Sequence, residues 1–140
     1  GEAAPDFTLD SDDRGPITLT RLRGRKVVLY FYPKDDTPGC TIQACDFRDS
    51  FARFDEVNVM ILGVSPDSVE SHRSFREKFA LTFPLLADVG AAVSERYGVM
   101  KGGWIVRSTF LVDEDGIVEG VWRDVNATGH MEMLAELLGA

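Results

Sequence analysis

The chain has 140 residues, the size of one domain, so we expect residues 1–140 to form a single domain around one core. Its composition, 44% hydrophobic and 27% charged, is typical of a globular protein and excludes a disordered or collagen-like one. The formal net charge of −8 argues against nucleic acid and anionic membranes as partners, because clustered basic residues bind both.

The apolar runs are too short to cross a membrane. The longest, 27–32 and 59–64, are far below the roughly 20 residues that a membrane-spanning helix needs. Residues 1–5 have neither the basic nor the apolar region of a secretory signal, although a targeting segment removed earlier would leave no mark. We therefore predict a cytoplasmic protein with no membrane partner.

The first part of the chain alternates β and helical patterns. Residues 7–9 and 17–19 alternate apolar and polar side chains around a turn-rich stretch, which predicts an N-terminal β-hairpin. The β-branched and aromatic run 27–32 ends at Pro33 and predicts a strand buried on both faces of a sheet. A helix should follow, because apolar residues then recur every three or four positions. This helical stripe consists of Cys40, Ala44, Phe47, Phe51 and Phe54.

The second part of the chain continues the alternation. Residues 57–64 predict another buried strand and residues 68–79 a charged amphipathic helix. The order of elements is typical of an α/β fold of the thioredoxin-like class, with a mixed central β-sheet flanked by helices and an N-terminal β-hairpin. The remaining predicted elements are a strand at 83–86, a helix at 91–97, a hairpin of 109–112 with 118–122, and a helix at 131–138.

The only two cysteines, Cys40 and Cys45, are too few for a disulfide scaffold. Cys40 follows the carboxyl end of a buried strand and begins the next helix, where open α/β sheets hold ligands and reactive groups. With Thr37 at the N-cap and Pro38 at the first helical position, Cys40 takes the third helical position. Free N–H groups and the helix dipole there favour a thiolate. Without the preceding loop, two bystander thiols would be the default interpretation.

A thiolate at Cys40 also needs a cation nearby, because the aspartates at 35–36 bring negative charge close to it. Lys34 is adjacent in sequence, but Arg107 is the only charge in the apolar or neutral run 104–112. A guanidinium that enters a sheet is costly unless it meets an anion. We expect Arg107 to meet the Cys40 thiolate, and the alternative is an ordinary ion pair with one of the 23 carboxylates.

The spacing of the two cysteines indicates a conformational switch. Five residues of α-helix give about 7.5 Å of rise and about 140° of rotation, which separates the Cα atoms by roughly 8 to 9 Å. A disulfide needs Cα atoms within about 7 Å. Cys40 and Cys45 can therefore bond only after the first helical turns unwind. Cys45 lies on the flank of the apolar stripe, so we expect it nearer the surface.

A metal site is the weaker interpretation of the thiols. Structural zinc sites typically use four Cys or His ligands, and this chain adds only two distant histidines, His72 and His130. His72 lies among charged residues of a predicted helix and His130 near a helix start, so we expect solvated or capping side chains. We predict no metal and no other cofactor.

The segment 33–45 resembles the active-site signature of the peroxiredoxins, Pro-x-x-x-Thr-x-x-Cys, starting at Pro33 and ending at Cys40. A second cysteine five residues on is similar to the subgroup called peroxiredoxin Q or bacterioferritin comigratory protein. Only residues 100–106 are less like the family, which leaves the substrate preference and the local partner surface open. Other blocks that resemble the family lie at 4–7, 83–88 and 107–110.

The resemblance implies a thioredoxin-dependent peroxidase, usually monomeric, that reduces hydrogen peroxide and organic hydroperoxides. Cys40 is then the peroxidatic cysteine, and Cys45 is the resolving cysteine that forms an intramolecular disulfide. Thr37, Arg107 and Pro33 complete the site. The Thr37 hydroxyl, the Cys40 N–H and the Arg107 guanidinium suit the developing oxyanion as donors, and Pro33 offers a wall without a donor.

Two other functions could use the same thiol pair. A disulfide oxidoreductase acting on proteins usually has a Cys-x-x-Cys pair, so the longer spacing here counts against it. A redox-sensing or interaction module would change shape on oxidation without sustained turnover. Turnover of peroxide with a dithiol reductant separates the enzyme from the sensor.

Overall fold

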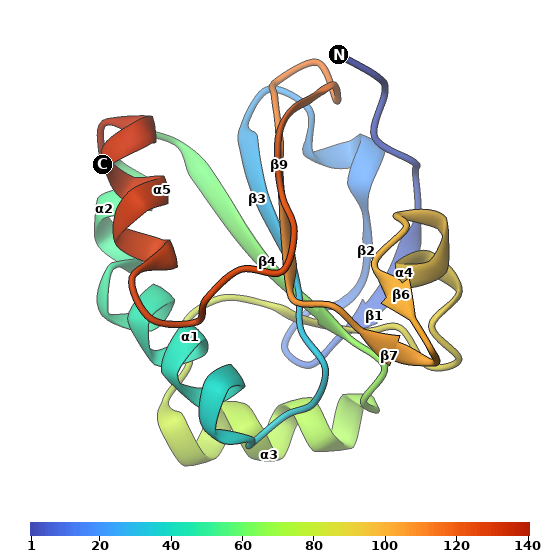
Figure 1. Ribbon diagram of the computed structural model, residues 1–140. Helices are drawn as coiled ribbons and strands as arrows, with labels where there is room; N and C mark the ends of the chain where they lie inside the picture. The colour runs from blue at the N-terminus through green and yellow to red at the C-terminus, as the bar shows by residue number, and fades with distance from the viewer.

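The computed structural model describes residues 1–140 as a mixed seven-stranded β-sheet with helices on both faces (Figure 1). The strand order is β2-β1-β5-β4-β3-β8-β9, and β6 and β7 form a separate hairpin. The strands are β1 (Thr8–Ser11), β2 (Gly15–Thr18), β3 (Lys26–Phe31), β4 (Val59–Ser65), β5 (Leu85–Ala87), β6 (Met100–Lys101), β7 (Trp104–Ile105), β8 (Ser108–Val112) and β9 (Val118–Trp122).

The helices divide between the two faces of this sheet (Figure 1). Helices α1, α2, α3 and α5 cover one face and share one apolar core with it, and η1 and α4 join the core of the other face together with the β1–β2 hairpin. No helix combines the length and apolar character that a membrane crossing requires. The helices are η1 (Leu19–Leu22), α1 (Pro38–Asp49), α2 (Phe51–Glu56), α3 (Val69–Phe79), α4 (Ala92–Arg96) and α5 (His130–Leu138).

Strand β3 lies at the centre of the sheet and leads directly to Cys40. It pairs in parallel with β4 and antiparallel with β8, and the residues from Val27 to Phe31 are all buried. Burial on both faces explains why this strand is a continuous apolar run instead of an alternating one. The predicted mixed α/β architecture, with an N-terminal hairpin and a buried central strand, is confirmed, and the strand ends at Phe31, two residues before Pro33.

The structure departs from the predicted elements most clearly at two places. Residues 40–54 were predicted to form a single helix, but they belong to two. Ser50, with φ −109° and ψ 9°, departs from helical geometry and separates α1 from α2. The apolar stripe nevertheless continues across the break, with the rings of Phe47 and Phe54 centred 6.0 Å apart. The β6–β7 hairpin was not predicted; Gly102 and Gly103 form its turn with φ of 59° and 76°. A Gly-Gly pair is a recognised signal for such a turn.

Candidate active site

Cys40 occupies the first turn of α1, at the end of the loop that leaves β3. Thr37 has extended dihedral angles, φ −103° and ψ 156°, and its carbonyl accepts the first helical hydrogen bond from Thr41 N at 2.8 Å. Pro38 is therefore the first helical residue and Cys40 the third, as the sequence predicts. The Cys40 side chain is turned into the protein, and the residue is only 2% exposed.

The Thr37 hydroxyl differs from the expectation. Thr37 holds the N-cap position, but its side chain makes no capping hydrogen bond to the helix. Its hydroxyl donates instead to the carbonyl oxygen of Lys34 at 2.8 Å. In this conformation the one hydroxyl proton is directed to Lys34, and the role of Thr37 as a donor to the reacting oxygen stays a prediction. The hydroxyl oxygen keeps lone pairs that can accept a hydrogen bond.

Arg107 makes the predicted contact with Cys40. It lies between β7 and β8, and its Nη2 donates to the Cys40 Sγ at 3.3 Å. Its Nη1 donates to Oε1 of Gln43 at 2.7 Å, so both sides of the guanidinium are held. A hydrogen bond from a cation stabilises a thiolate more than a neutral thiol. Gly39 leaves room for this arrangement, since a Cβ there would lie 2.9 Å from Nη2.

Gln43 is the site residue that the sequence analysis missed. It is 1% exposed, it faces Arg107 from the next turn of α1, and its Nε2 has no hydrogen-bond partner. The spacing could have indicated it, because Gln43 is three residues after Cys40 and residues three apart in a helix share a face. The guanidinium group of arginine is planar and its N–H groups point in fixed directions, so the hydrogen bond to Gln43 also orients the N–H group that faces Cys40.

Pro33 and Cys45 lie at the margins of this arrangement. Pro33 is half-buried and lines a groove with Pro66, Trp104 and Ile105. Cys45 is half-buried on α1, more accessible than Cys40 as predicted, and both thiols are free. The structure thus joins Cys40 and Arg107 by a direct contact and holds Cys45 apart on the same intact helix.

Beneath α1, Tyr30 places a phenol in the core. The residue is 1% exposed and its hydroxyl has no hydrogen-bond partner. Burial raises the pKa of Tyr30 well above its ordinary value, and negative charge at Cys40 acts in the same direction. The phenol therefore stays protonated and adds no charge next to the thiol. Gly63 makes room for it, since a Cβ there would lie 2.9 Å from the ring.

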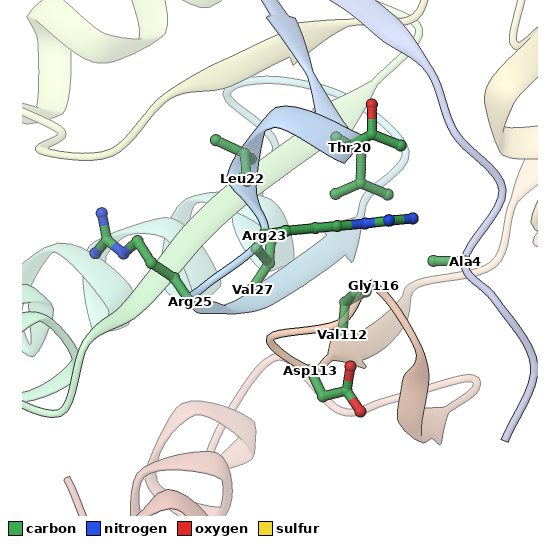
Figure 2. Close-up of a pocket in the computed structure, with 10 residues that line it drawn as sticks. Ala4, Thr20, Leu22, Arg23, Arg25, Val27, Val112, Asp113 and Gly116 are labelled. Carbon is green, nitrogen blue, oxygen red and sulfur yellow. The ribbon is translucent and has the colours of Figure 1, made fainter.

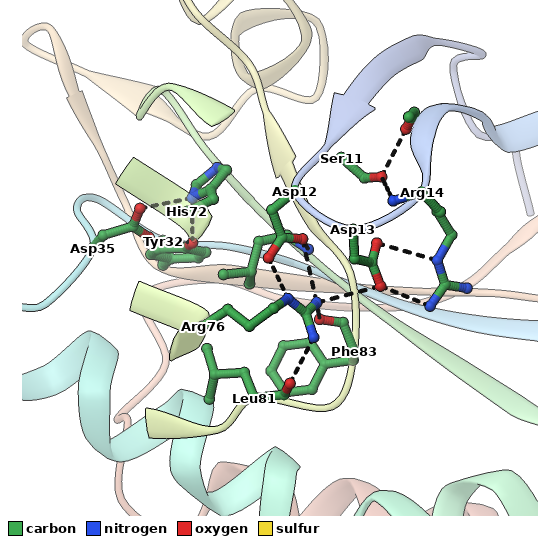
Figure 3. Close-up of polar contacts among 12 residues, drawn as sticks. Ser11, Asp12, Asp13, Arg14, Tyr32, Asp35, His72, Arg76, Leu81 and Phe83 are labelled. Atoms are coloured by element: carbon green, nitrogen blue, oxygen red, sulfur yellow. Dashed lines mark hydrogen bonds and ion pairs between the residues drawn. The ribbon is translucent and has the colours of Figure 1, made fainter. Parts of the chain in front are cut away.

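Both histidines are buried, which corrects the expectation of solvated or capping side chains. His130 is 6% exposed, and its Nε2 lies 2.8 Å from the Thr109 hydroxyl. His72 is fully buried and contacts Asp35, a residue of the loop before Cys40 (Figure 3). Charged neighbours in sequence were misleading, because His72 shares the inner face of α3 with Phe75.

His72, Asp35 and Asp67 are the three residues whose ligand atoms lie close enough, within 4.8 Å, to suggest a metal. These atoms already bond to one another and to nearby hydroxyl and amide groups, and Asp67 accepts hydrogen bonds from Ser65 and from the Asp35 N–H. The geometry is that of a hydrogen-bonded cluster.

Another pocket lies at the opposite end of β3 from Cys40 (Figure 2). Val27 and Val112 form its floor, and the side chain of Arg23 extends into it beside Gly116. Neither cysteine lines it.

Comparisons with known proteins agree with this geometry. The AhpC/TSA family profile matches residues 1–121. The putative peroxiredoxin bcp of Coxiella burnetii is 47% identical over 99% of this chain and 95% of that protein. The peroxiredoxin Bcp of Bacillus subtilis is 45% identical over 94% of this chain and 88% of that protein. A structure of the Xanthomonas campestris bacterioferritin comigratory protein, from work on its alkyl peroxide reduction, has a TM-score of 0.91 and 38% identity, covering 95% of this chain and 90% of that one.

Proposed function

The chain belongs to the AhpC/TSA family as a thiol peroxidase of the peroxiredoxin Q or Bcp type, and we propose that Cys40 is its peroxidatic residue and Cys45 its resolving residue. One observation carries this assignment. Arg107 donates a hydrogen bond to the Cys40 sulfur at 3.3 Å, in the first turn of a helix. No hydrogen bond from a cation reaches the Cys45 sulfur.

The first step is attack of the Cys40 thiolate on the terminal, hydrogen-bearing oxygen of a hydroperoxide. The S–O bond forms as the O–O bond breaks, and the leaving oxygen takes a proton to give water or an alcohol. Cys40 becomes a sulfenic acid and is oxidised by two electrons. We expect Arg107, which already donates to the Cys40 sulfur, to stabilise the negative charge that develops on the oxygens, with the Cys40 N–H as a second donor.

The second step joins the two cysteines. The Cys45 thiol attacks the Cys40 sulfur, a disulfide forms, and the sulfenic oxygen leaves as water. Both residues lie in the regular helix α1, so its first turns must unwind before the sulfurs meet. A dithiol reductant then cleaves the disulfide through a mixed disulfide and returns both thiols.

Membership of the family supports a proposal for the substrates and the reductant. We propose hydrogen peroxide and organic hydroperoxides as substrates, supported by the alkyl peroxide reduction of the Xanthomonas protein. We propose thioredoxin as the reductant and a cytoplasmic monomer as the working form. The groove of Pro33 and Trp104, beside the loop before Cys40, offers an apolar surface for an alkyl group.

The experiment is a coupled peroxidase assay with thioredoxin and its reductase. The wild type should turn over peroxide continuously, and Cys40→Ser should be inactive. Cys45→Ser should react once and leave a sulfenic acid at Cys40 that a dimedone probe traps. Turnover by Cys40→Ser would refute the assignment. Stoichiometric oxidation of the wild type without turnover would indicate a sensor instead.

A further inference from the structure

We propose that His72 is a positioning residue for the peroxide reaction: with Asp35 it holds the loop 33–37 against α3, an arrangement we call the clamp, and so keeps the start of α1 in its reactive geometry. The inference rests on the proposed role of Cys40. It concerns a buried group that the reaction steps above do not use, since His72 lies on α3 and has no contact with either cysteine among its hydrogen bonds.

The clamp is centred on the carboxylate of Asp35, whose side chain is 4% exposed. Its Oδ1 accepts a hydrogen bond from the Tyr32 hydroxyl at 2.6 Å. Its Oδ2 accepts from the Ser71 hydroxyl at 2.8 Å. The same oxygen lies 2.7 Å from Nδ1 of His72 (Figure 3). A buried carboxylate is costly unless it is satisfied in this way, so the loop has one strongly preferred position.

The two hydrogen bonds of the His72 ring require two hydrogens, one in each contact. Nε2 lies 2.9 Å from the carbonyl oxygen of Leu86, which can only accept, so Nε2 carries a hydrogen. The 2.7 Å contact between Nδ1 and Asp35 Oδ2 then needs a second hydrogen between these atoms. Either imidazolium faces carboxylate, or neutral imidazole faces carboxylic acid. Both states join the loop to α3 by a short hydrogen bond.

The clamp acts on the active site through the loop backbone. The Asp35 N–H donates to Asp67 at 2.8 Å, which fixes the backbone next to Lys34. The carbonyl of Lys34 in turn accepts the Thr37 hydroxyl at 2.8 Å. Thr37 is the N-cap of α1 and lies only two residues after Asp35. Fixing Asp35 therefore also fixes where α1 begins. A shift of about 1 Å at reacting groups can cost about a hundredfold in rate.

The clamp does not depend on the part of the chain that must unwind. Its partners come from the end of β3, the end of β4, α3 and β5, and none comes from α1. The loop can therefore stay in place while α1 opens for disulfide formation. When the disulfide is reduced and α1 refolds, the loop is already in the position that the reactive geometry of Cys40 needs.

Two substitutions of His72 separate positioning from packing. In His72→Asn the amide nitrogen stands near the place of Nδ1 and can still donate to Asp35, whereas in His72→Gln it stands near the place of Nε2 and reaches Leu86 instead. Both remove the ring. Each is placed in a Cys45→Ser background, and the rate of sulfenic acid formation at Cys40 with hydrogen peroxide is measured by stopped flow with a dimedone trap.

We expect His72→Gln to react about ten- to a hundredfold more slowly than the parent and His72→Asn to stay within about threefold of it. With Cys45 present, reduction of the disulfide by dithiothreitol should be unchanged in both. Equal rates for the two variants would overturn the proposal, because a packing role does not distinguish the two nitrogens. A parent whose Cys40 does not react with peroxide would instead refute the proposed function.

Variants of Asp35 keep the test decisive if His72→Gln does not fold. In Asp35→Asn the amide can donate to Nδ1 of a neutral imidazole, so the link to α3 is kept without the extra proton. In Asp35→Ala the link is lost. The first should react within about threefold of the parent and the second at least about tenfold more slowly. Equal rates in this pair would also overturn the proposal.

Discussion

At the scale of single residues, the reactive geometry depends on how one guanidinium is shared. Arg107 donates to the Cys40 sulfur through Nη2 and to the Gln43 amide oxygen through Nη1. The planar fork of arginine fixes the angle between these bonds, so holding one nitrogen aims the other. Gln43 thus orients the cation without a negative charge that would compete with the thiolate for it.

Replacement of Arg107 should slow the reaction of Cys40 with peroxide. Arg107→Ala removes the donor that faces the sulfur, and loss of one such donor typically costs about 10²- to 10³-fold. Arg107→Lys keeps the charge but loses the fork, so we expect an intermediate rate. The measurement is the second-order rate constant of sulfenic acid formation at neutral pH, with Lys34→Ala as the control for a nearby exposed cation. If Arg107→Ala reacted as fast as the control, the contact would have no role in the chemistry.

At the scale of elements, the break at Ser50 separates the helix that carries both cysteines from α2. Helix α2 is anchored by the fully buried Phe54 and by Arg53, which pairs with Glu132 of α5 at 2.9 Å. Near its C-terminal end α1 is held in the same way, by the fully buried Phe47 and by a hydrogen bond from Arg48 to the carbonyl of Phe79 at 2.6 Å, so we expect only the turns before Phe47 to unwind. The two cysteines both lie on the α1 side of this break.

Oxidation should therefore increase amide hydrogen exchange in α1 and leave α2 protected. Disulfide formation requires the early turns of α1 to unwind, and their amide groups then lose the helical hydrogen bonds that protect them. The measurement is mass-spectrometric exchange on reduced and oxidised protein, comparing peptides from residues 38–49 and 51–56. Cys45→Ser treated with peroxide is the control, since it cannot form the disulfide. Unchanged exchange in 38–49 would contradict the unwinding step.

Much of this site could be predicted from local sequence. Cys40 sits at the third helical position because the Thr-Pro before it specifies a helix start, and Arg107 stands out as a lone charge in an apolar run. The hydrogen bond of Thr37 to Lys34 could not be predicted, since a threonine before a helix can cap it or turn back to the loop. The burial of His72 depends on the fold, because its partners Asp35 and Leu86 come from other elements.

At the scale of the whole molecule, Arg76 ties the N-terminal hairpin to the rest of the fold (Figure 3). From α3 it pairs with Asp12 in the turn of the hairpin and donates to the carbonyls of Leu81 and Phe83. The Asp12 carboxylate is fully buried and also accepts from the N–H of Leu85 at 3.1 Å. One ion pair thus joins the hairpin, α3 and the start of β5.

Arg76→Met should destabilise the protein by about 3 to 5 kcal/mol, because it leaves the carboxylate of Asp12 buried without its partner. Urea unfolding at neutral pH measures this change, and we propose that residues 1–140 unfold in one transition as a single domain. Arg14→Met is the matched control, since Arg14 pairs with Asp13 at a half-exposed surface and such pairs contribute about 0 to 1 kcal/mol. Equal losses of unfolding free energy in the two variants would contradict the larger contribution expected of the buried pair.

His130 makes the stability of the whole molecule depend on pH. Burial lowers the pKa of His130 from its ordinary value of 6.5, so the unfolded chain binds a proton in a range where the folded protein does not. The free energy of unfolding contributed by this group is complete above 6.5 and falls as the pH drops from there to the lower folded pKa. The slope is at most about 1.4 kcal/mol per pH unit for one proton.

His130→Gln can keep the hydrogen bond to Thr109 and cannot titrate, so its urea midpoint should fall less than that of the wild type between about pH 7 and about pH 5. Parallel falls in the two proteins would show that other groups, and not His130, set the stability in this range.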